Sequence, residues 1–317
     1  MPSAAIYSQV TVEIVPDISY NFGHSTYTMD FFAFGPNGER DGVKSELEFP
    51  IDGPMAGLQF RIRSDAAVAH PWSITAAARM NVADPGGTMY DSDWAFDPST
   101  GANTFLFSYT ESGVEGSMID ASIDGRYQFT GNSSGALGGI LSFTYVRLDQ
   151  DVIGFTGWAY DQNLTRVEFS DGRLGITYLA WYATPQLGLY GQLPAFESGS
   201  IDLAVSTGPV WAKDIDDHVL RGKESIADGL GLGVNSSLAM RIPLPGRGAS
   251  RPFVELGGYL RYYVVDGDQT QTWYQDEGDP SDEFYVPAGT TIDNLPHEFK
   301  TMQYGANVRL GLMLGGR

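Results

Sequence analysis

The stretch Leu230-Gly-Leu-Gly-Val-Asn-Ser-Ser-Leu-Ala-Met-Arg-Ile-Pro-Leu244 alternates between large apolar side chains and small or polar ones. From Leu230 onward the even positions are almost all apolar, whereas the odd positions hold Gly, Asn, Ser, Ala, Arg and Pro. A β-strand places these two sets on opposite faces, and a helix would scatter both around its surface. The stretch therefore predicts a strand with one apolar face and one polar face.

The same alternation recurs at Val254–Val264, Tyr304–Leu314 and Ile119–Tyr127, and charges of both signs, such as Asp120 and Arg126, occupy the polar faces. Strands of a soluble β-sandwich usually run about five or six residues, with the polar face in bulk water. Here the alternation lasts about ten residues or more. A membrane barrel requires this pattern, because it turns apolar side chains toward lipid and keeps a polar network inside. Closure of the barrel also removes the unpaired strand edges that lipid does not tolerate.

About ten segments alternate in this way, and the lengths of their connections alternate as well. The segments lie near 8–21, 43–62, 71–82, 117–129, 137–150, 170–192, 200–212, 228–244, 252–268 and 300–314. Short turns are expected near Asp65–Ala69, Asn132–Gly135, Pro194–Ser198 and Gly246–Ser250, and long polar loops near Gly35–Gly42, Asp84–Gly116, Asp151–Arg166, Asp214–Ala227 and Asp268–Phe299. We therefore predict one domain over residues 1–317. It is an all-β, transmembrane, antiparallel up-and-down β-barrel of about ten strands with long extracellular loops.

The composition argues against several other classes of protein. The chain has no cysteine, which excludes disulfides and thiolate metal sites, and no apolar run near the roughly 18 residues that a transmembrane helix requires. Its formal net charge of −20 argues against nucleic acid as a partner. It is compatible with the attraction of cationic peptides, or simply with the solubility of long loops. Met1-Pro-Ser lacks the positive region and apolar core of a signal peptide, so we expect an exported protein with this sequence to be a mature form.

Two pairs of side chains near strand ends can carry chemistry. The chain has four histidines, and His218 stands two residues after Asp216 at the end of a predicted strand, so both side chains can project into the barrel. A carboxylate beside an imidazole fixes its tautomer and raises its basicity, as a general base for water requires. Asp91 and Asp93, at the start of another long loop, also share a face. Taken separately, the acids of either pair could be solvated charges on the rim. Together, at the upper strand ends of a closed barrel, the two pairs could oppose each other across the lumen.

Two motifs around these residues resemble those of the omptin family of outer-membrane proteases. Gly86-Gly-Thr-Met-Tyr-Asp91-Ser-Asp93-Trp94 is similar to the G-G-x-M-x-D-x-D-W motif of the second omptin loop, and Asp214-Ile-Asp216-Asp217-His218 is similar to the D-x-D-x-H motif of the fourth. The resemblance implies an endopeptidase of the Gram-negative outer membrane, with its site facing the exterior. Asp91 and His218 would hold and deprotonate the attacking water, Asp216 would orient His218, and Asp93 would complete the acidic pair and help polarise the peptide. Neither a metal nor a covalent intermediate is needed.

The resemblance also suggests where substrate and lipid bind. Omptins cleave beside basic residues with acidic groups in the S1 pocket, and Asp214 matches one of these groups, whereas the other falls near Tyr27 or Thr28, which are not acidic. Arg147 matches a residue that binds lipopolysaccharide on the outer wall, so lipopolysaccharide is a candidate activator. We expect polypeptides, outer-membrane lipid and lipopolysaccharide as partners, and a monomer.

The sequence is also compatible with two other functional hypotheses. The chain could be a non-enzymatic barrel, such as an adhesin, a structural protein or a small pore, that retains the motif residues by descent. The pore is the weaker form, because side chains largely fill the lumen of a ten-stranded barrel. A lipid-modifying barrel enzyme would instead place its catalytic residues toward lipid, whereas the parity of the motif residues places them inside.

Overall fold

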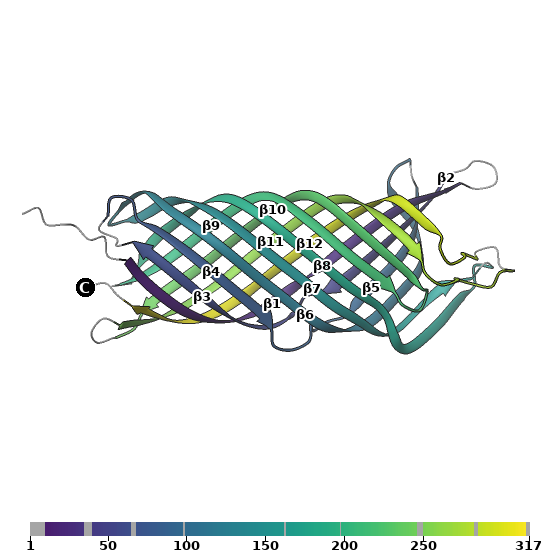
Figure 1. The fold of residues 1–317 in the computed structure, drawn as a ribbon, viewed down its shortest axis with the longest axis horizontal. Helices are drawn as coiled ribbons and strands as arrows, with labels where there is room; N and C mark the ends of the chain where they lie inside the picture. Colours follow the sequence, from purple (N-terminus) through teal and green to yellow (C-terminus); the bar gives the residue numbers. More distant parts are fainter. Residues whose placement is uncertain are drawn as a thin grey trace, which may run out of the picture.

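The computed structural model describes residues 10–34, 40–64, 68–97, 99–161, 163–196, 198–245, 250–281 and 285–314, and its regular elements there are all β-strands (Figure 1). They are β1 (Val10–Phe34), β2 (Arg40–Pro50), β3 (Gly53–Ser64), β4 (Trp72–Asn81), β5 (Met89–Asp97), β6 (Ala102–Asn132), β7 (Gly135–Tyr160), β8 (Arg166–Ala195), β9 (Gly199–His218), β10 (Lys223–Pro243), β11 (Ser250–Trp273) and β12 (Thr291–Leu314). No helix in the described part of the chain is long and apolar enough to cross a membrane.

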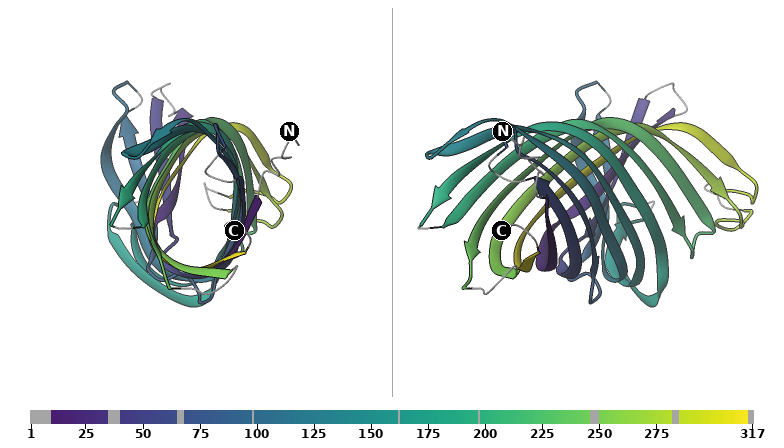
Figure 2. Two further views of the ribbon diagram at one scale, coloured as in Figure 1. Left: turned by 90° about the vertical axis from the view of Figure 1, so that its left-hand side faces the viewer. Right: turned by 60° about the vertical axis from the view of Figure 1, so that its left-hand side comes forward.

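Ten of the strands close into one antiparallel ring. The order is β1, β3, β4, β6, β7, β8, β9, β10, β11 and β12, and β12 pairs back onto β1, with Ile18 opposite Val308. Figure 2 shows the closed wall in a view along the barrel. Each strand of the ring pairs with the ring strands that precede and follow it in the chain, which is up-and-down topology. The predicted barrel of about ten strands is confirmed.

The two remaining strands, β2 and β5, extend the wall upward. We call the end with the connections after β1, β7, β9 and β11 the loop end, and the opposite end, where β1 begins and β12 stops, the turn end. β3 pairs with β4 in the lower wall, and above them β2 pairs with β5. The breaks between β2 and β3 and between β4 and β5 therefore leave the wall closed at the height where Asp91 and Asp93 lie.

An apolar outer surface surrounds the middle of the barrel. Ile18, Leu232, Leu238 and Val308 are 68%, 70%, 53% and 51% exposed, and each alternates with side chains that face inward. Exposed apolar side chains at the same height on neighbouring strands form the lipid-facing band of an outer-membrane barrel. On β9 this band ends at Trp211, so the last residues of the strand project beyond the membrane.

The lumen is divided by a cluster of buried apolar side chains. Phe49 stacks on Tyr178 with ring centroids 3.8 Å apart, and Tyr182 packs against Tyr263 at 5.8 Å. Met55 and further buried apolar residues join them in one cluster. Toward the turn end the interior changes to arginines and carboxylates, such as Arg241 on Glu13 at 2.8 Å. The cluster thus lies between a charged lower lumen and the loop end.

The predicted loop lengths were wrong in most places. Strand residues occupy much of Asp84–Gly116 (β5 and the start of β6), Asp151–Arg166 (the end of β7), Asp214–Ala227 (the ends of β9 and β10) and Asp268–Phe299 (the ends of β11 and β12). Apolar alternation marks a strand only where one face meets lipid. Above the membrane both faces are polar, so the pattern fades although the hydrogen-bonded ladder continues.

Two of the predicted short turns are confirmed. Asn132 pairs with Gly135 across a two-residue turn, and β8 ends at Ala195 only shortly before β9 begins at Gly199. The turns expected near Asp65–Ala69 and Gly246–Ser250, and the loop near Gly35–Gly42, fall partly outside the described residues.

Candidate active site

Asp216 and His218 lie at the loop end of β9 and face the lumen together, as the alternation predicts. His218 Nε2 lies 2.9 Å from Asp216 Oδ2, and the Asp216 side chain is completely buried. The Tyr27 hydroxyl, from β1 on another part of the wall, donates a second hydrogen bond to the same Asp216 oxygen. The carboxylate is thereby fixed from two sides, and it fixes the imidazole in turn.

Burial governs the ionisation of this pair, which lies beyond the membrane-facing band. Burial lowers the pKa of His218, and the positive charge of Lys223 lowers it further, against the opposing effect of Asp216. For Asp216, burial raises the pKa, but the charge of His218 and the hydrogen bonds from His218 and Tyr27 outweigh it and hold the pKa below its usual value. A neutral imidazole beside an ionised carboxylate is therefore the state at neutral pH.

Asp91 and Asp93 lie on β5, not in a loop, and their parity on this strand directs both side chains to the same face. The β2–β5 register places Asp91 opposite Leu47 and Asp93 opposite Ser45. Burial raises the pKa of Asp91 to about 8, and the nearby charges of Asp93 and Asp216 add to the effect. The structure thus brings Asp91 within electrostatic reach of Asp216.

Lys223 is a member of this site that sequence reasoning missed. It begins β10, directly opposite His218 in the β9–β10 register, and it is only 5% exposed. Burial lowers its pKa to about 8, with a further contribution from Arg221, and its charge acts on both Asp91 and His218. The signal in the sequence was the tight turn between His218 and Lys223, since the two residues that close a turn share a face.

Asp214 lies deeper than the other motif residues. Its side chain is fully buried, and Asp214 Oδ2 is 3.4 Å from Nε2 of the equally buried His297 of β12. Tyr27 packs on the His297 ring with centroids 4.9 Å apart and covers this pair. Asp214 therefore faces His297 and not the open part of the lumen. Tyr27 and His297 are two further residues that the motifs did not point to, because they come from β1 and β12.

Arg147 lies on the outer wall, on the opposite face of the barrel wall from the lumen-facing groups. Its guanidinium is 2.9 Å from Asp149, the next outward-facing residue of β7, and about half of both side chains is exposed. Trp181 of β8 lies beside Arg147 in the sheet register, and Lys213 of β9 lies beside Trp181. A cation, an aromatic ring and a second cation thus line up across three strands on the outer wall.

Comparison with known proteins identifies a solved structure with a similar fold. No protein-family model matches the sequence. None of the curated proteins matches it either. Among solved structures, the chain is similar to the outer membrane protease OmpT from Escherichia coli, with a TM-score of 0.68, 12% identity and 97% of each chain covered. At this identity, the likeness shows an omptin-like outer-membrane barrel fold.

Two other outer-membrane proteins match less well. The transport unit of the autotransporter AIDA-I from Escherichia coli has a TM-score of 0.28 at 9% identity, over 96% of this chain and 92% of that chain. A Pseudomonas aeruginosa FadL homologue has a TM-score of 0.25 at 7% identity, over 95% of this chain and 90% of that chain.

Proposed function

We propose that this protein is an outer-membrane endopeptidase whose site opens at the loop end of the barrel. The observation that carries this proposal is the buried Asp216–His218 pair, 2.9 Å apart, with the buried carboxylate of Asp91 within reach of its charge. Amide hydrolysis by water can use a base and an acid whose pKa values are shifted in opposite directions. The omptin-like fold is consistent with this chemistry.

In this mechanism His218 is the general base. Its Nε2–H donates to Asp216, so Nδ1 is unprotonated and accepts a proton from the attacking water. The oxygen of that water forms the new bond to the peptide carbonyl carbon. Asp216 stabilises the imidazolium that results, and Tyr27 keeps Asp216 in place through its hydrogen bond. The imidazolium then supplies the proton that the departing amine needs.

Asp91 acts as the acid in this mechanism. With its pKa raised to about 8 it carries a proton at neutral pH, and Asp93 lies beside it on the same face of β5. A protonated carboxyl can donate a hydrogen bond to the peptide carbonyl oxygen as negative charge develops there. This role differs from the one the family resemblance implies, in which Asp91 helps to deprotonate the water.

The substrates we propose are extracellular polypeptides. The chain carries 39 acidic residues against 19 basic ones, so its field attracts cationic peptides. A preference for cleavage beside basic residues does not follow from Asp214, because its carboxylate is buried against His297. Arg147, exposed on the outer wall, is the residue we propose to contact lipopolysaccharide phosphates.

The function is tested by incubating the refolded barrel, with and without lipopolysaccharide, with a diverse peptide library. Mass spectrometry of the products gives the cut sites. We expect internal cleavage that needs no added metal. If no peptide is cut under either condition while the barrel is folded, the protein is instead a non-enzymatic barrel that retains the motif residues.

The pH dependence of cleavage follows from the two shifted pKa values. The base must be unprotonated, so kcat/KM should rise as the pH passes the pKa of His218, which burial holds below its ordinary value. The acid must be protonated, so kcat/KM should fall above about pH 8, where Asp91 ionises. A kcat/KM profile on one peptide measures both limbs. Activity that keeps rising well beyond pH 8 would exclude the acid role of Asp91.

Tyr27→Phe should lower kcat by about ten-fold or more, because it removes a hydrogen bond to an ionised, buried carboxylate. The acidic limb of the pH profile should move as well, since His218 depends on Asp216. Tyr182→Phe is the matched control: Tyr182 is equally buried, but its hydroxyl pairs with Ser25 at 2.7 Å and does not touch the pair. Equal losses in the two variants would mean that Tyr27 has only a packing role.

A further inference from the structure

A large polar cavity occupies the lower lumen, on the far side of the apolar cluster from the candidate active site. Its volume is about 1030 Å³, and its lining includes Asn132, Ser133 and Ser200, which lie in or beside the short turns. Entry is therefore from the turn end. None of the residues assigned to hydrolysis lines it.

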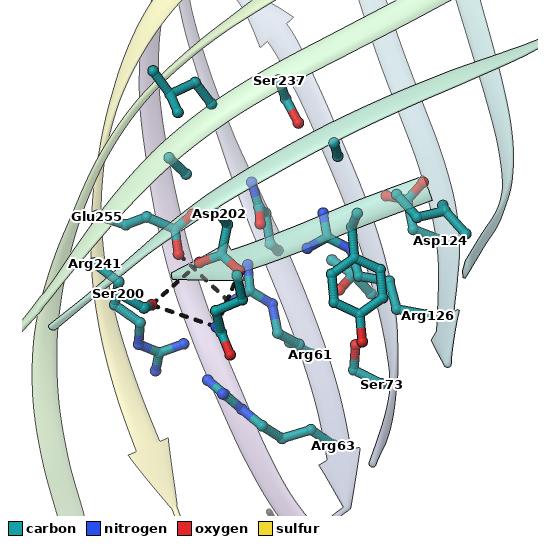
Figure 3. A pocket seen from close by; sticks show the side chains of 18 of the residues that line it. Arg61, Arg63, Ser73, Asp124, Arg126, Ser200, Asp202, Ser237, Arg241 and Glu255 are labelled. Atoms are coloured by element: carbon teal, nitrogen blue, oxygen red, sulfur yellow. Dashed lines mark hydrogen bonds and ion pairs between the residues drawn. The ribbon is translucent and has the colours of Figure 1, made fainter. Parts of the chain in front are cut away.

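Arginine dominates the charge of this cavity. Among the described residues, eight arginines line it against four carboxylates, although acidic residues outnumber basic ones two to one in the whole chain. Figure 3 shows Arg61, Arg63 and Arg241 on one side of the cavity and Arg126 on another. The arginines come from several strands of the wall, so their donors point inward from several directions.

The nearby carboxylates do not balance this charge. Glu13 is completely buried and is shared by Arg61 at 3.3 Å, Arg241 at 2.8 Å and Arg63. Asp120 is likewise shared by Arg79 at 2.5 Å and Arg261 at 3.3 Å. Glu13 and Asp17 are buried nearby but do not line the cavity. When they are added to the four carboxylates that do, the eight arginines are still in excess.

Two of the arginines keep hydrogen-bond donors that a ligand can reach. Arg126 has no ion pair or hydrogen bond with the described residues; the Tyr190 ring lies 5.4 Å from its guanidinium carbon, and its charge also acts on Asp124. Arg63 keeps 31% of its side chain exposed, and its Nε has no hydrogen-bond partner among the described residues. Both face the cavity.

The membrane strengthens the field inside this cavity. Phe60 and Ile62, which flank Arg61 on β3, are 50% and 41% exposed on the outer wall, so this level of the barrel is surrounded by lipid. Low-dielectric walls focus the field of an enclosed charge and raise the local concentration of counter-ions. An excess of buried positive charge is costly unless a partner of opposite sign neutralises it.

We infer that this arginine-rich cavity is a binding site for a small, multiply charged phosphate compound that enters from the turn end of the barrel. Guanidinium forks bind phosphate through paired, charge-assisted hydrogen bonds. A tetrahedral phosphate accepts such bonds from many directions, as this ring of donors requires, whereas a carboxylate offers only two oxygens in one plane. In an outer-membrane barrel the short turns face the periplasm, so the ligand comes from that side.

Isothermal titration of the purified full-length barrel in neutral detergent with inorganic tripolyphosphate tests this site. We expect saturable binding that weakens as the salt concentration rises, and weaker binding of citrate than of pyrophosphate, which carries a similar charge near neutral pH. Arg63→Gln and Arg126→Gln should each lower the affinity about ten-fold. Asp202→Asn should raise it, since Asp202 lines the cavity and accepts hydrogen bonds from Gln192 and Ser200.

Arg173→Gln removes the same charge at an exposed position near the loop end, where Arg173 pairs with Asp171, and should leave binding unchanged. His218→Ala should also bind normally, because the apolar cluster separates the two sites. Two results would overturn the assignment: no binding of tripolyphosphate at low salt, or equal losses of affinity in Arg173→Gln and Arg63→Gln.

Discussion

His218→Ala should lower kcat/KM for peptide cleavage by about 10²- to 10⁴-fold, the usual contribution of a positioned general base. The variant loses the imidazole that lies 2.9 Å from Asp216 and leaves the buried carboxylate without that partner. The loss should appear in kcat more than in KM, because the base acts on the water and not on the peptide. Cleavage of one fluorogenic peptide by wild type and variant measures the effect.

His70→Ala is the matched control, since it removes the same side chain from the turn end of the barrel, where His70 contacts the Gln128 carbonyl at 3.2 Å. Its activity should equal that of the wild type. Circular dichroism of both variants should show an intact barrel. A folded His218→Ala protein that cleaves peptides at the wild-type rate would rule out the proposed mechanism, and the fold would be unaffected.

Glu13→Gln should lower the free energy of unfolding by about 3–5 kcal/mol, the cost of removing one partner from a buried ion pair. Glu13 is completely buried and holds Arg61, Arg63 and Arg241 together. Without its charge these three guanidinium groups repel one another inside a lipid-surrounded wall. Urea titration of unfolding in lipid vesicles, followed by tryptophan fluorescence, measures the change.

Glu168→Gln provides the comparison for Glu13→Gln. Glu168 also accepts from an arginine, Arg166 at 3.4 Å, but its side chain is 79% exposed near the loop end. Exposed pairs of this kind contribute about 0–1 kcal/mol, so the stability should hardly change. If the two variants lose equal stability, the buried arginine network does not hold the lower barrel together.

The membrane part of the fold could be predicted from the sequence alone. Alternation such as that from Leu230 to Leu244 states which side chains face lipid, because lipid excludes polar groups on one face only. The Asp216–His218 pair was also predictable, since residues two apart on a strand are neighbours on the same face. The strand ends could not be predicted, because above the membrane water meets the outer face and the apolar pattern disappears.

The tertiary structure determined which inward-facing residues lie at the same height in the barrel. Parity tells whether a side chain points inward, but the register of every strand pair around the ring determines which inward residues meet. Arg241 reaches Glu13 across 228 residues of sequence, and Tyr27 reaches Asp216 across 189. Lys223 beside His218 and His297 beside Asp214 follow from the same registers. The sequence by itself thus determined a barrel and half of its candidate site, and ring closure decided what faces that half and which charges gather below it.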